Sequence, residues 1–539
     1  MRATLARGHD QRQHPALGPD APSSGLAAAQ PRLTRGVLLA VVVLLELLVF
    51  CVYVRTMAPT ITWRNDGADS GDLVTAAINL GVPHPTGYPW YTWLAHWFAA
   101  WPGRDPARSV ALFSALAATG AVLAVFWIAY RLNRMPGGET PALAAAWAGA
   151  GLFAFGELLW SQATIAEVYA LHALLVAALL AVALSGHTRA RPYVLAALLG
   201  LGLAHHLTIV LLLPALWPYG KTARSWLTWR RLLGIALCLL PGLLTYLYIP
   251  LRAGAYPLPN WGQADSPSGF LWLVSGAAYR QYLRILPPSA GLQRLLAWLG
   301  IWRRDLGILG LALALLGLWR GLETNRRFAY FALTYVLLLT TYSFLYATSD
   351  SYLYLLPAAE IMALWVAGGA AALWRALQTW AKPGRPRLLV TIAALLLLSA
   401  LPLFSVVTRF QAMDTSSDRE AYTFADNLLG AAAPDALIVS DGGAQTFSLW
   451  YLRYGLGKRP DVAVVDQNLL AFDWYRTDLA RRLPELASLR DAYDAQEAAV
   501  MLVRAEASRR PIHLTGSNSL WLPLADWRQE GPFLTLARQ

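Results

Sequence analysis

Two aspartates three residues apart, Asp69 and Asp72, open the stretch DSGDLVTAAINLG, which follows the first long apolar run of the chain. Asp69 or Ser70 can cap a helix, Asp72 falls in its first turn, and Gly81 can end it. A carboxylate at a helix N-terminus stays ionised because the helix dipole favours negative charge there. Two compatible interpretations follow: helix capping, and a general base that takes a proton from a hydroxyl group. Asp66, three residues earlier, is the aspartate least expected to matter.

The next segment, HPTGYPWYTWLAHWFAAWPG, combines a histidine, a stiff turn and a tryptophan face. Pro85, Gly87 and Pro89 predict a turn that fixes His84, which is either a structural residue or a catalytic or ligand residue. The tryptophan face at helical spacing favours an interfacial helix in the headgroup layer, with a sugar-stacking platform as the alternative. It consists of Trp90, Trp93, Trp97 and Trp101.

Further polar side chains fall where a bilayer makes them costly. They are Glu167, Tyr169, His205, His206, Arg252 and Asp350. Intramembrane ionisable groups usually face a cavity and mark a site, whereas interfacial ones can simply be solvated. Arginine offers bidentate recognition of phosphate, although Arg252 could equally anchor to headgroups. All six are expected on the outer leaflet side, which favours a shared site.

The elements that position these residues are membrane helices. Of the 539 residues, 56% are hydrophobic and only 14% are charged, against about 25% charged in soluble proteins. Many apolar runs of spanning length follow the first, so the first is not a signal peptide. Cys51 and Cys238 lie inside such runs, and their number and spacing exclude a disulfide framework or a zinc site. The net charge of +12 sits mainly beside the spans, so membrane lipids and not nucleic acid explain it.

About eleven membrane segments are predicted, after a disordered cytoplasmic tail at 1–31 and flanking Arg32 and Arg35. The region 192–217 is interpreted as two half-length helices that meet near His205 and His206. This hairpin keeps the basic residues after it on the cytoplasmic side: Lys221, Arg224, Arg230 and Arg231. The other spans are predicted at 37–54, 109–130, 141–160, 165–185, 231–250, 305–320, 328–347, 353–375 and 388–407.

Two long outer loops, 55–108 and 252–304, carry several arginines against the topological trend. An anionic ligand at the outer face explains them, and so does the charge-independent translocation of long loops. After about residue 409 the sequence APDALIVSDGGAQTFSLWYLRYGLGKRPDVAVVD reads as strand, helix, strand. The segment 409–539 is therefore predicted as an α/β domain on the outer side.

Taken in order, the segments DSGDLVTAA, GVPHPTGYPWYTWL, WSQATIAEVYALHAL, GLGLAHHLTIVLLLP, YLYIPLRAGAYPLPNWG and SDSYLYLLP form a pattern. With it the chain resembles the prokaryotic relatives of the plexin-type protein O-mannosyltransferase, in the GT-C glycosyltransferase superfamily. The resemblance covers roughly residues 37 to 480, and His-Pro-x-Gly-Tyr-Pro is its most specific part. It implies a polytopic α-helical GT-C-like domain over 32–408.

The resemblance also implies a polyprenyl-phosphate-sugar donor and transfer of a mannose-like hexose at the outer face, with Arg252 as a donor-phosphate ligand. Its catalytic carboxylate maps to Asp69 with Asp72 beside it. The family usually has Glu at the second position, so the shorter reach of Asp72 favours Asp69 as the base. Donor and substrate contacts are expected from His84, Tyr88, Glu167, Tyr169, His205, His206, Arg252 and Asp350. No metal or other cofactor is expected if arginine and histidine neutralise the leaving phosphate.

The resulting hypothesis is an inverting glycosyltransferase of the plasma membrane, with a cytoplasmic N-terminus and an extracytoplasmic C-terminal domain. Its partners would be a polyprenyl-phosphate-linked sugar, membrane lipids and a protein, lipid or glycan acceptor. A transporter or flippase of lipid-linked saccharides is the alternative, since broken helices suit it. Against it, no internal repeat is evident and the polar groups gather at one face. A scaffold whose outer domain binds a partner would leave the acidic loop unexplained.

Overall fold

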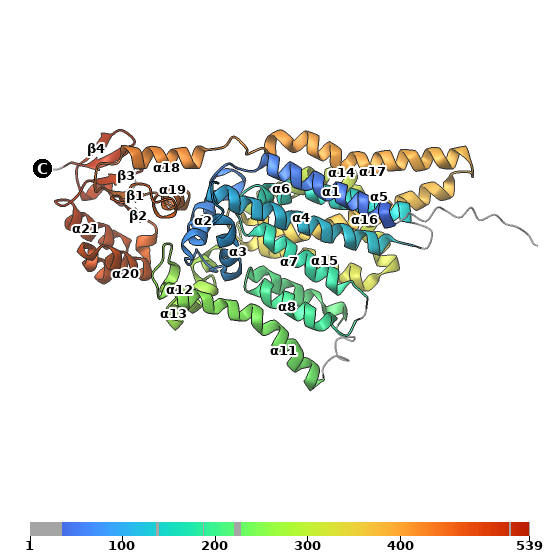
Figure 1. The fold of residues 1–539 in the computed structure, drawn as a ribbon, viewed down its shortest axis with the longest axis horizontal. Helices are drawn as coiled ribbons and strands as arrows, with labels where there is room; N and C mark the ends of the chain where they lie inside the picture. Colours follow the sequence, from blue (N-terminus) through green and yellow to red (C-terminus); the bar gives the residue numbers. More distant parts are fainter. Residues whose placement is uncertain (1–34, 136–138, 187, 220–227, 517–518, 538–539) are drawn as a thin grey trace, which may run out of the picture.

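The computed structural model describes residues 35–135, 139–186, 188–219, 228–516 and 519–537. A helical bundle and a C-terminal α/β domain follow each other along the long axis of the molecule (Figure 1). Parts of the sequence prediction lie outside the described residues: the tail 1–31, Arg32, Lys221 and Arg224.

Long apolar helices build the bundle. Among the described residues, seven helical segments are long and apolar enough to cross a membrane. The 22 residues of α1 extend about 33 Å at 1.5 Å per residue, which matches a hydrocarbon core of about 30 Å. The seven are α1 (Arg35–Thr56), α4 (Pro106–Asn133), α11 with α12 (Trp229–Leu244 and Tyr248–Ala253), α14 (Pro288–Thr324), α15 (Arg326–Leu345), η7 with α16 (Ser351–Leu355 and Leu356–Trp380) and α17 (Arg385–Met413).

Several of the predicted segments are broken or short. Helices α5 (Glu139–Ala154) and α6 (Glu157–Ala163) form one candidate span bent by 61°. The helix also breaks at His205 and His206, as predicted, between α8 and a short turn. The shorter pieces are α7 (Tyr169–Ala183), α8 (Arg191–Leu203), η2 (Leu207–Leu211) and α9 (Leu212–Ala215). Because α7, α8 and α9 are shorter than a span, the total of about eleven stays a prediction.

Small residues let the central helices approach closely. A side chain at Gly317 of α14 would lie 1.8 Å from the carbonyl oxygen of Trp365, and one at Gly369 of α16 would lie 1.9 Å from that of Leu313. Such backbone contact is the usual way in which membrane helices pack tightly. The α14–α16 pair therefore forms a rigid frame behind the loops at the bundle end.

Short elements close the end of the bundle that faces the C-terminal domain (Figure 1). Strand-like hydrogen bonds join the two outer loops, from Val82 N to Pro259 O (2.9 Å) and from Trp261 N to Val82 O (3.1 Å). Since α14 begins at Pro288, the irregular part of the second loop is shorter than predicted. The short elements are η1 (Arg64–Asp69), α2 (Ser70–Asn79), α3 (Pro89–Ala99), η5 (Trp261–Gln263), α13 (Pro267–Val274) and η6 (Ala277–Tyr282).

The C-terminal domain holds a five-stranded sheet in the order β2-β1-β3-β5-β4. Strand β1 pairs in parallel with β2 and β3, whereas β5 is antiparallel to β3 and β4. The predicted strand–helix–strand over its first part is confirmed as β1, α19 and β2. The elements are α18 (Glu420–Ala431), β1 (Leu437–Ser440), α19 (Gly443–Trp450), β2 (Ala463–Asp466), α20 (Asp473–Arg482), α21 (Ala495–Glu506), β3 (Ile512–Leu514), β4 (Trp527–Glu530) and β5 (Phe533–Leu536).

Helix α19 docks this domain onto α2 of the first outer loop. The indole N–H of Trp63 donates to the carbonyl oxygen of Ala444 (3.1 Å) and to Ser448 Oγ (3.0 Å). A Cβ on Gly71 of α2 would lie 2.2 Å from the carbonyl oxygen of Phe447. The α/β domain therefore sits against the helix that carries the two candidate aspartates.

Candidate active site

Asp72 is a buried carboxylate with a complete set of hydrogen-bond donors. Its side chain is fully buried. Oδ2 accepts hydrogen bonds from the backbone N–H of His84 (2.9 Å) and from its ring Nδ1 (2.7 Å). Oδ1 accepts a third from the indole N–H of Trp261 (3.1 Å). Three donors compensate the burial of the charge.

Asp69 differs from Asp72 in that its carboxylate is open to solvent. It is the N-cap residue of α2, yet its side chain makes no capping hydrogen bond. The side chain is 46% exposed, and its Oδ2 lies 3.7 Å from His84 Nε2. Partial desolvation raises the pKa of Asp69; the positive His84 opposes this, while Asp72, Asp350 and Asp66 raise the pKa further. The net rise makes Asp69 a stronger proton acceptor than an ordinary aspartate.

The HPTGYP turn fixes His84 between the two aspartates. The carbonyl oxygen of His84 accepts from Gly87 N (2.9 Å), and Gly87 has a positive φ of 86° that suits glycine. Burial lowers the pKa of His84, but Asp69 and the hydrogen bond to Asp72 outweigh burial and raise the pKa to about 9. At neutral pH the ring is therefore an imidazolium that faces both carboxylates.

A second layer of predicted residues lies behind this group. Buried Glu167 accepts from Val168 N (3.2 Å), and burial together with the nearby Asp69 raises its pKa well above the usual value. His205 Nε2 donates to the carbonyl oxygen of Val168 (3.0 Å). The ring of His206 lies 5.8 Å from that of Tyr169. The structure thus brings together predicted residues from three separate segments.

His172 is a member of this layer that the sequence prediction missed. Its ring lies 4.6 Å from that of His206, and both rings contact Thr208 Oγ1, at 3.1 and 2.7 Å. The sequence signal was available, because His172 is an ionisable residue inside an apolar run.

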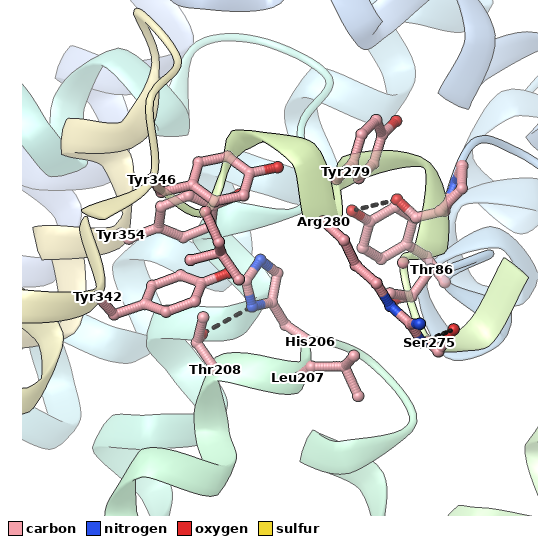
Figure 2. A pocket seen from close by; sticks show the side chains of 14 residues that line it. Thr86, His206, Leu207, Thr208, Ser275, Tyr279, Arg280, Tyr342, Tyr346 and Tyr354 are labelled. Carbon is pink, nitrogen blue, oxygen red and sulfur yellow. Dashed lines mark hydrogen bonds between the residues drawn. The ribbon is translucent and has the colours of Figure 1, made fainter. Parts of the chain in front are cut away.

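A pocket opens between the two outer loops and the end of α15 (Figure 2). It encloses about 600 Å³ of space between atoms, open solvent included. Tyrosines from one side face polar groups from the other across it (Figure 2). The lining comprises Tyr342, Tyr346, Tyr354, His206, Leu207 and Thr208 on one side, and Pro85, Thr86, Tyr88, Ser275, Gly276, Tyr279, Arg280 and Leu283 on the other.

Asp69 is outside the pocket lining, but His84, 3.7 Å from Asp69, has its ring 5.3 Å from that of Tyr88 in the lining. Apart from burial, Asp69 is the largest influence that raises the pKa values of Tyr88 and Tyr279, which both line the pocket. Arg280 is the arginine of the lining; it is exposed and donates from Nη2 to Ser275 Oγ (3.0 Å). The sequence prediction did not single out Arg280, but the unexplained arginines of loop 252–304 were the signal for it.

Arg252, expected as a donor-phosphate ligand, contacts the end of α2 and is not among the residues that line the pocket. Its Nε donates to the carbonyl oxygen of Leu80 (2.7 Å) and its Nη2 to that of Asn79 (3.0 Å). These carbonyls close the C-terminus of α2, where a cation is favoured by the helix dipole. Among the described residues that line the pocket, the arginine is Arg280 and not Arg252.

The remaining acidic residues, Asp66 and Asp350, are not among the residues that line the pocket. The hydroxyl of Tyr352, two residues after Asp350, donates to Asp66 Oδ2 and so joins the segment between α15 and α16 to the first outer loop. Asp350 acts on Asp69 through its charge.

The tryptophan face of the first outer loop lies on α3 and just after it. Three of its four members are exposed, with Trp93 at 45%, Trp97 at 64% and Trp101 at 48%. This matches the exposed face that the interfacial-helix interpretation requires.

Comparisons with known proteins identify the fold and the relatives of this chain. Residues 69–226 match the family described as the protein O-mannosyl-transferase TMEM260 N-terminal domain, and 421–503 match TMEM260-associated domain 2. Two solved structures share the fold. ArnT from Cupriavidus metallidurans bound to undecaprenyl phosphate has a TM-score of 0.50 and 14% sequence identity, over 81% of this chain and 91% of that chain. The Archaeoglobus fulgidus oligosaccharyltransferase with a tethered acceptor peptide has a TM-score of 0.51 and 13% sequence identity, over 89% of this chain and 69% of that chain. The chain is therefore a polytopic membrane protein of the GT-C fold.

Within that class, the chain is related to protein O-mannosyl-transferases. It is 28% identical to the mouse protein O-mannosyl-transferase TMEM260 over 447 residues, which is 78% of this chain and 62% of the mouse protein. The Dictyostelium discoideum protein of the same description is 25% identical over 319 residues, 52% of this chain and 36% of that protein. The chain thus spans less than two thirds of the length of these relatives. The predicted resemblance is confirmed.

Proposed function

We propose that this protein is a membrane glycosyltransferase. It transfers a mannose-like hexose from a polyprenyl-phosphate donor to an acceptor hydroxyl at the outer face of the membrane. The observation that carries the proposal is Asp69: a half-exposed carboxylate with a raised pKa, 3.7 Å from the His84 ring and beside a pocket that contains an arginine. The relationship to protein O-mannosyl-transferases supports the mannose-like sugar.

In this proposal the reaction is a single displacement. Asp69 takes the proton of the acceptor hydroxyl, and the hydroxyl oxygen forms a bond to the anomeric carbon. The bond from that carbon to the donor phosphate oxygen breaks, and polyprenyl phosphate leaves with the electron pair. Attack opposite the leaving group inverts the anomeric configuration. A half-exposed base with a raised pKa suits this role, because it is accessible to the acceptor and is a better proton acceptor.

The donor phosphate would meet Arg280 in the pocket, with His206 on the opposite wall. Arginine binds phosphate through paired charge-assisted hydrogen bonds. Arg252, the ligand implied by the family resemblance, and His205 lie outside the pocket lining of the described residues. We therefore assign the phosphate to Arg280, while Arg252 holds α2.

The lipid tail would enter between the spans. A second cavity of about 800 Å³, open solvent included, lies between α7, α8, α9 and α11, and its lining is almost wholly apolar. Leu195, Leu199, Leu212, Leu213 and Ile235 contribute to it. A polyprenyl chain has the chemistry that such a surface buries favourably. A transporter is less well supported, because the candidate polar groups gather at the end of the bundle beside the α/β domain.

We further propose that the α/β domain lies outside the plasma membrane and helps recognise the acceptor, which could be a protein, a lipid or a glycan. Its contact with α2 supports this assignment, since an acceptor held by the domain would lie near Asp69.

The test uses the full chain reconstituted in liposomes with labelled polyprenyl-phosphate mannose or glucose and candidate acceptors. The wild-type protein is expected to transfer sugar, and Asp69→Asn to lose about 10²- to 10⁴-fold in kcat, the usual contribution of a general base. Asp265→Asn is the matched control, because Asp265 is exposed and its carboxylate contacts only Tyr256 among the described groups. Full activity of the Asp69→Asn protein would remove Asp69 as the base. Absence of transfer and hydrolysis with every donor would favour a transporter.

A further inference from the structure

A chain of two hydrogen bonds and one ionic contact links the candidate base to the second outer loop. The indole N–H of Trp261 donates to Asp72 Oδ1 (3.1 Å), Asp72 Oδ2 accepts from His84 Nδ1 (2.7 Å), and His84 Nε2 lies 3.7 Å from Asp69 Oδ2. Trp261, Asp72 and His84 are all buried, whereas Asp69 is half exposed. The buried members of this chain are thus rigidly paired, and its exposed end is the group that would meet the acceptor.

The inner end of the chain rests on the α/β domain. The ring of Trp261 lies 5.3 Å from that of Trp474, 6.1 Å from that of Phe447 and 6.5 Å from that of Trp450, and all three belong to the domain. Ring contacts at these separations fix the orientation of an indole group. The direction of the Trp261 N–H, and with it the position of Asp72, therefore depends on how the domain is seated.

We infer that Trp261, Asp72 and His84 are positioning residues for the proposed transfer, and that the α/β domain sets the orientation of the Asp69 base through them. The inference rests on the proposed function of Asp69. It gives the domain a role in catalysis beyond acceptor recognition, because an unseated domain would loosen Trp261 and leave Asp72 and His84 without their fixed partner.

The charges around His84 support this role. Asp69, Asp72 and Glu167 face the ring, and Tyr88 packs against it edge-on at 5.3 Å. The charged groups that act on Asp69 are His84, Asp72, Asp350 and Asp66; Glu167 is a buried neighbour whose own pKa burial and Asp69 raise well above the usual value. His84 is the single cation in this set, so it offsets the repulsion among the carboxylates and keeps Asp69 available as an anion.

The first test is the pH dependence of kcat. His84→Asn retains an amide that can donate to Asp72 but has no charge. We expect the acid limb of its profile to move up by about one pH unit or more, the usual effect of removing an opposite charge within about 4 Å. Trp261→Phe keeps the ring and removes the N–H. It should lower kcat about ten- to a hundredfold with the donor KM unchanged, as misplacement of a catalytic group does.

The control is Trp147→Phe, which removes an indole N–H in α5 that has no partner among the described groups. The kcat and pH profile of this variant should match those of the wild type.

The second test needs no activity. It uses NMR of the protein in detergent with carbon-13-labelled histidine, and the His84 signal is assigned as the one missing from the His84→Asn spectrum. The His84 pKa is expected well above its usual value, and it should fall in Asp69→Asn and in Asp72→Asn.

The outcomes separate the two proposals. If the wild type transfers sugar and Asp69→Asn does not, but His84→Asn and Trp261→Phe behave as the wild type, the positioning role is overturned and the proposed function stands. If no donor is used at all, the proposed function fails, and the NMR titration still decides whether His84 is coupled to Asp69. A His84 pKa near its ordinary value of about 6.5 that neither aspartate variant changes would refute the coupling.

Discussion

Substitution by asparagine is expected to lower the stability of the protein at Asp72 and only its activity at Asp69. In Asp72→Asn the new amide must face donors on both sides: His84 with two N–H groups, and Trp261 with one. An amide has one acceptor oxygen, so in either orientation its NH₂ group lies opposite a buried donor. The imidazolium of His84 also loses its buried partner.

The magnitude follows from these contacts. Breaking one member of a buried, hydrogen-bonded charge pair costs about 3–5 kcal/mol, because the remaining charge stays buried. Asp72 is fully buried, so this range applies without a discount for solvent screening. Asp69 is 46% exposed and 3.7 Å from His84, so Asp69→Asn should change the free energy of unfolding by about 0–1 kcal/mol. One variant is therefore expected to lose stability, and the other only activity.

The assay is SDS-induced unfolding in mixed micelles, followed by tryptophan fluorescence and compared for the wild type and the two variants at pH 7. A lowered free energy of unfolding for Asp72→Asn with a nearly wild-type value for Asp69→Asn is expected. Equal stability of both variants would refute the assignment of Asp72 as the buried anchor of His84, since a solvent-accessible Asp72 would carry no such cost.

Three more predictions follow from individual contacts. Arg280→Ala should raise the donor KM about ten- to a hundredfold through the loss of charge-assisted hydrogen bonds. The control is Arg284→Ala, because Arg284 is exposed and lies four residues later. Equal donor KM values for the two variants would remove Arg280 as the phosphate ligand. Arg252→Ala should lower the free energy of unfolding by about 1–3 kcal/mol without changing the donor KM, because its two hydrogen bonds go to α2; a raised KM would restore it as a phosphate ligand. The pKa of buried His84 is about 9, whereas that of an unfolded histidine is about 6.5. Protonated His84 therefore stabilises the fold by about 3 kcal/mol below about pH 6.5, and this stabilisation is lost as the pH rises to about 9. The free energy of unfolding, measured from about pH 6 to about pH 10, should show this loss in the wild type and not in His84→Asn.

The features that the sequence predicted are those encoded locally. Apolar runs of spanning length identify the bundle, and a pair of histidines in the middle of one run marks the broken hairpin at His205 and His206. Short apolar strands, followed by turn residues such as the SDGG after LIV, identify β1, α19 and β2. These signals need no knowledge of distant partners, because hydropathy and turn chemistry act within a few residues.

What sequence could not predict depends on contacts between distant segments. Trp261 is 189 residues from Asp72, and no local pattern pairs them. Arg252 was predicted at the phosphate because the YIPL segment precedes it, but the fold directs its guanidinium to the C-terminus of α2. Arg280 lines the pocket on η6, which follows the turn at Gly276 with its positive φ of 62°, and no local pattern in the sequence marks this position.

The division of roles between Asp69 and Asp72 is a consequence of helix geometry. Residues three apart on a helix lie on the same face about one turn apart, so both carboxylates can reach one histidine. Asp72 lies one turn further in, where α19 and Trp261 cover it, and Asp69 lies at the start of α2, where the chain is still open to solvent. The same spacing that suggested a capped helix start thus places one buried and one half-exposed carboxylate around a single histidine ring. In this arrangement Trp261 donates to Asp72 and also packs against Trp474 of the α/β domain, so one side chain joins the buried carboxylate to the domain.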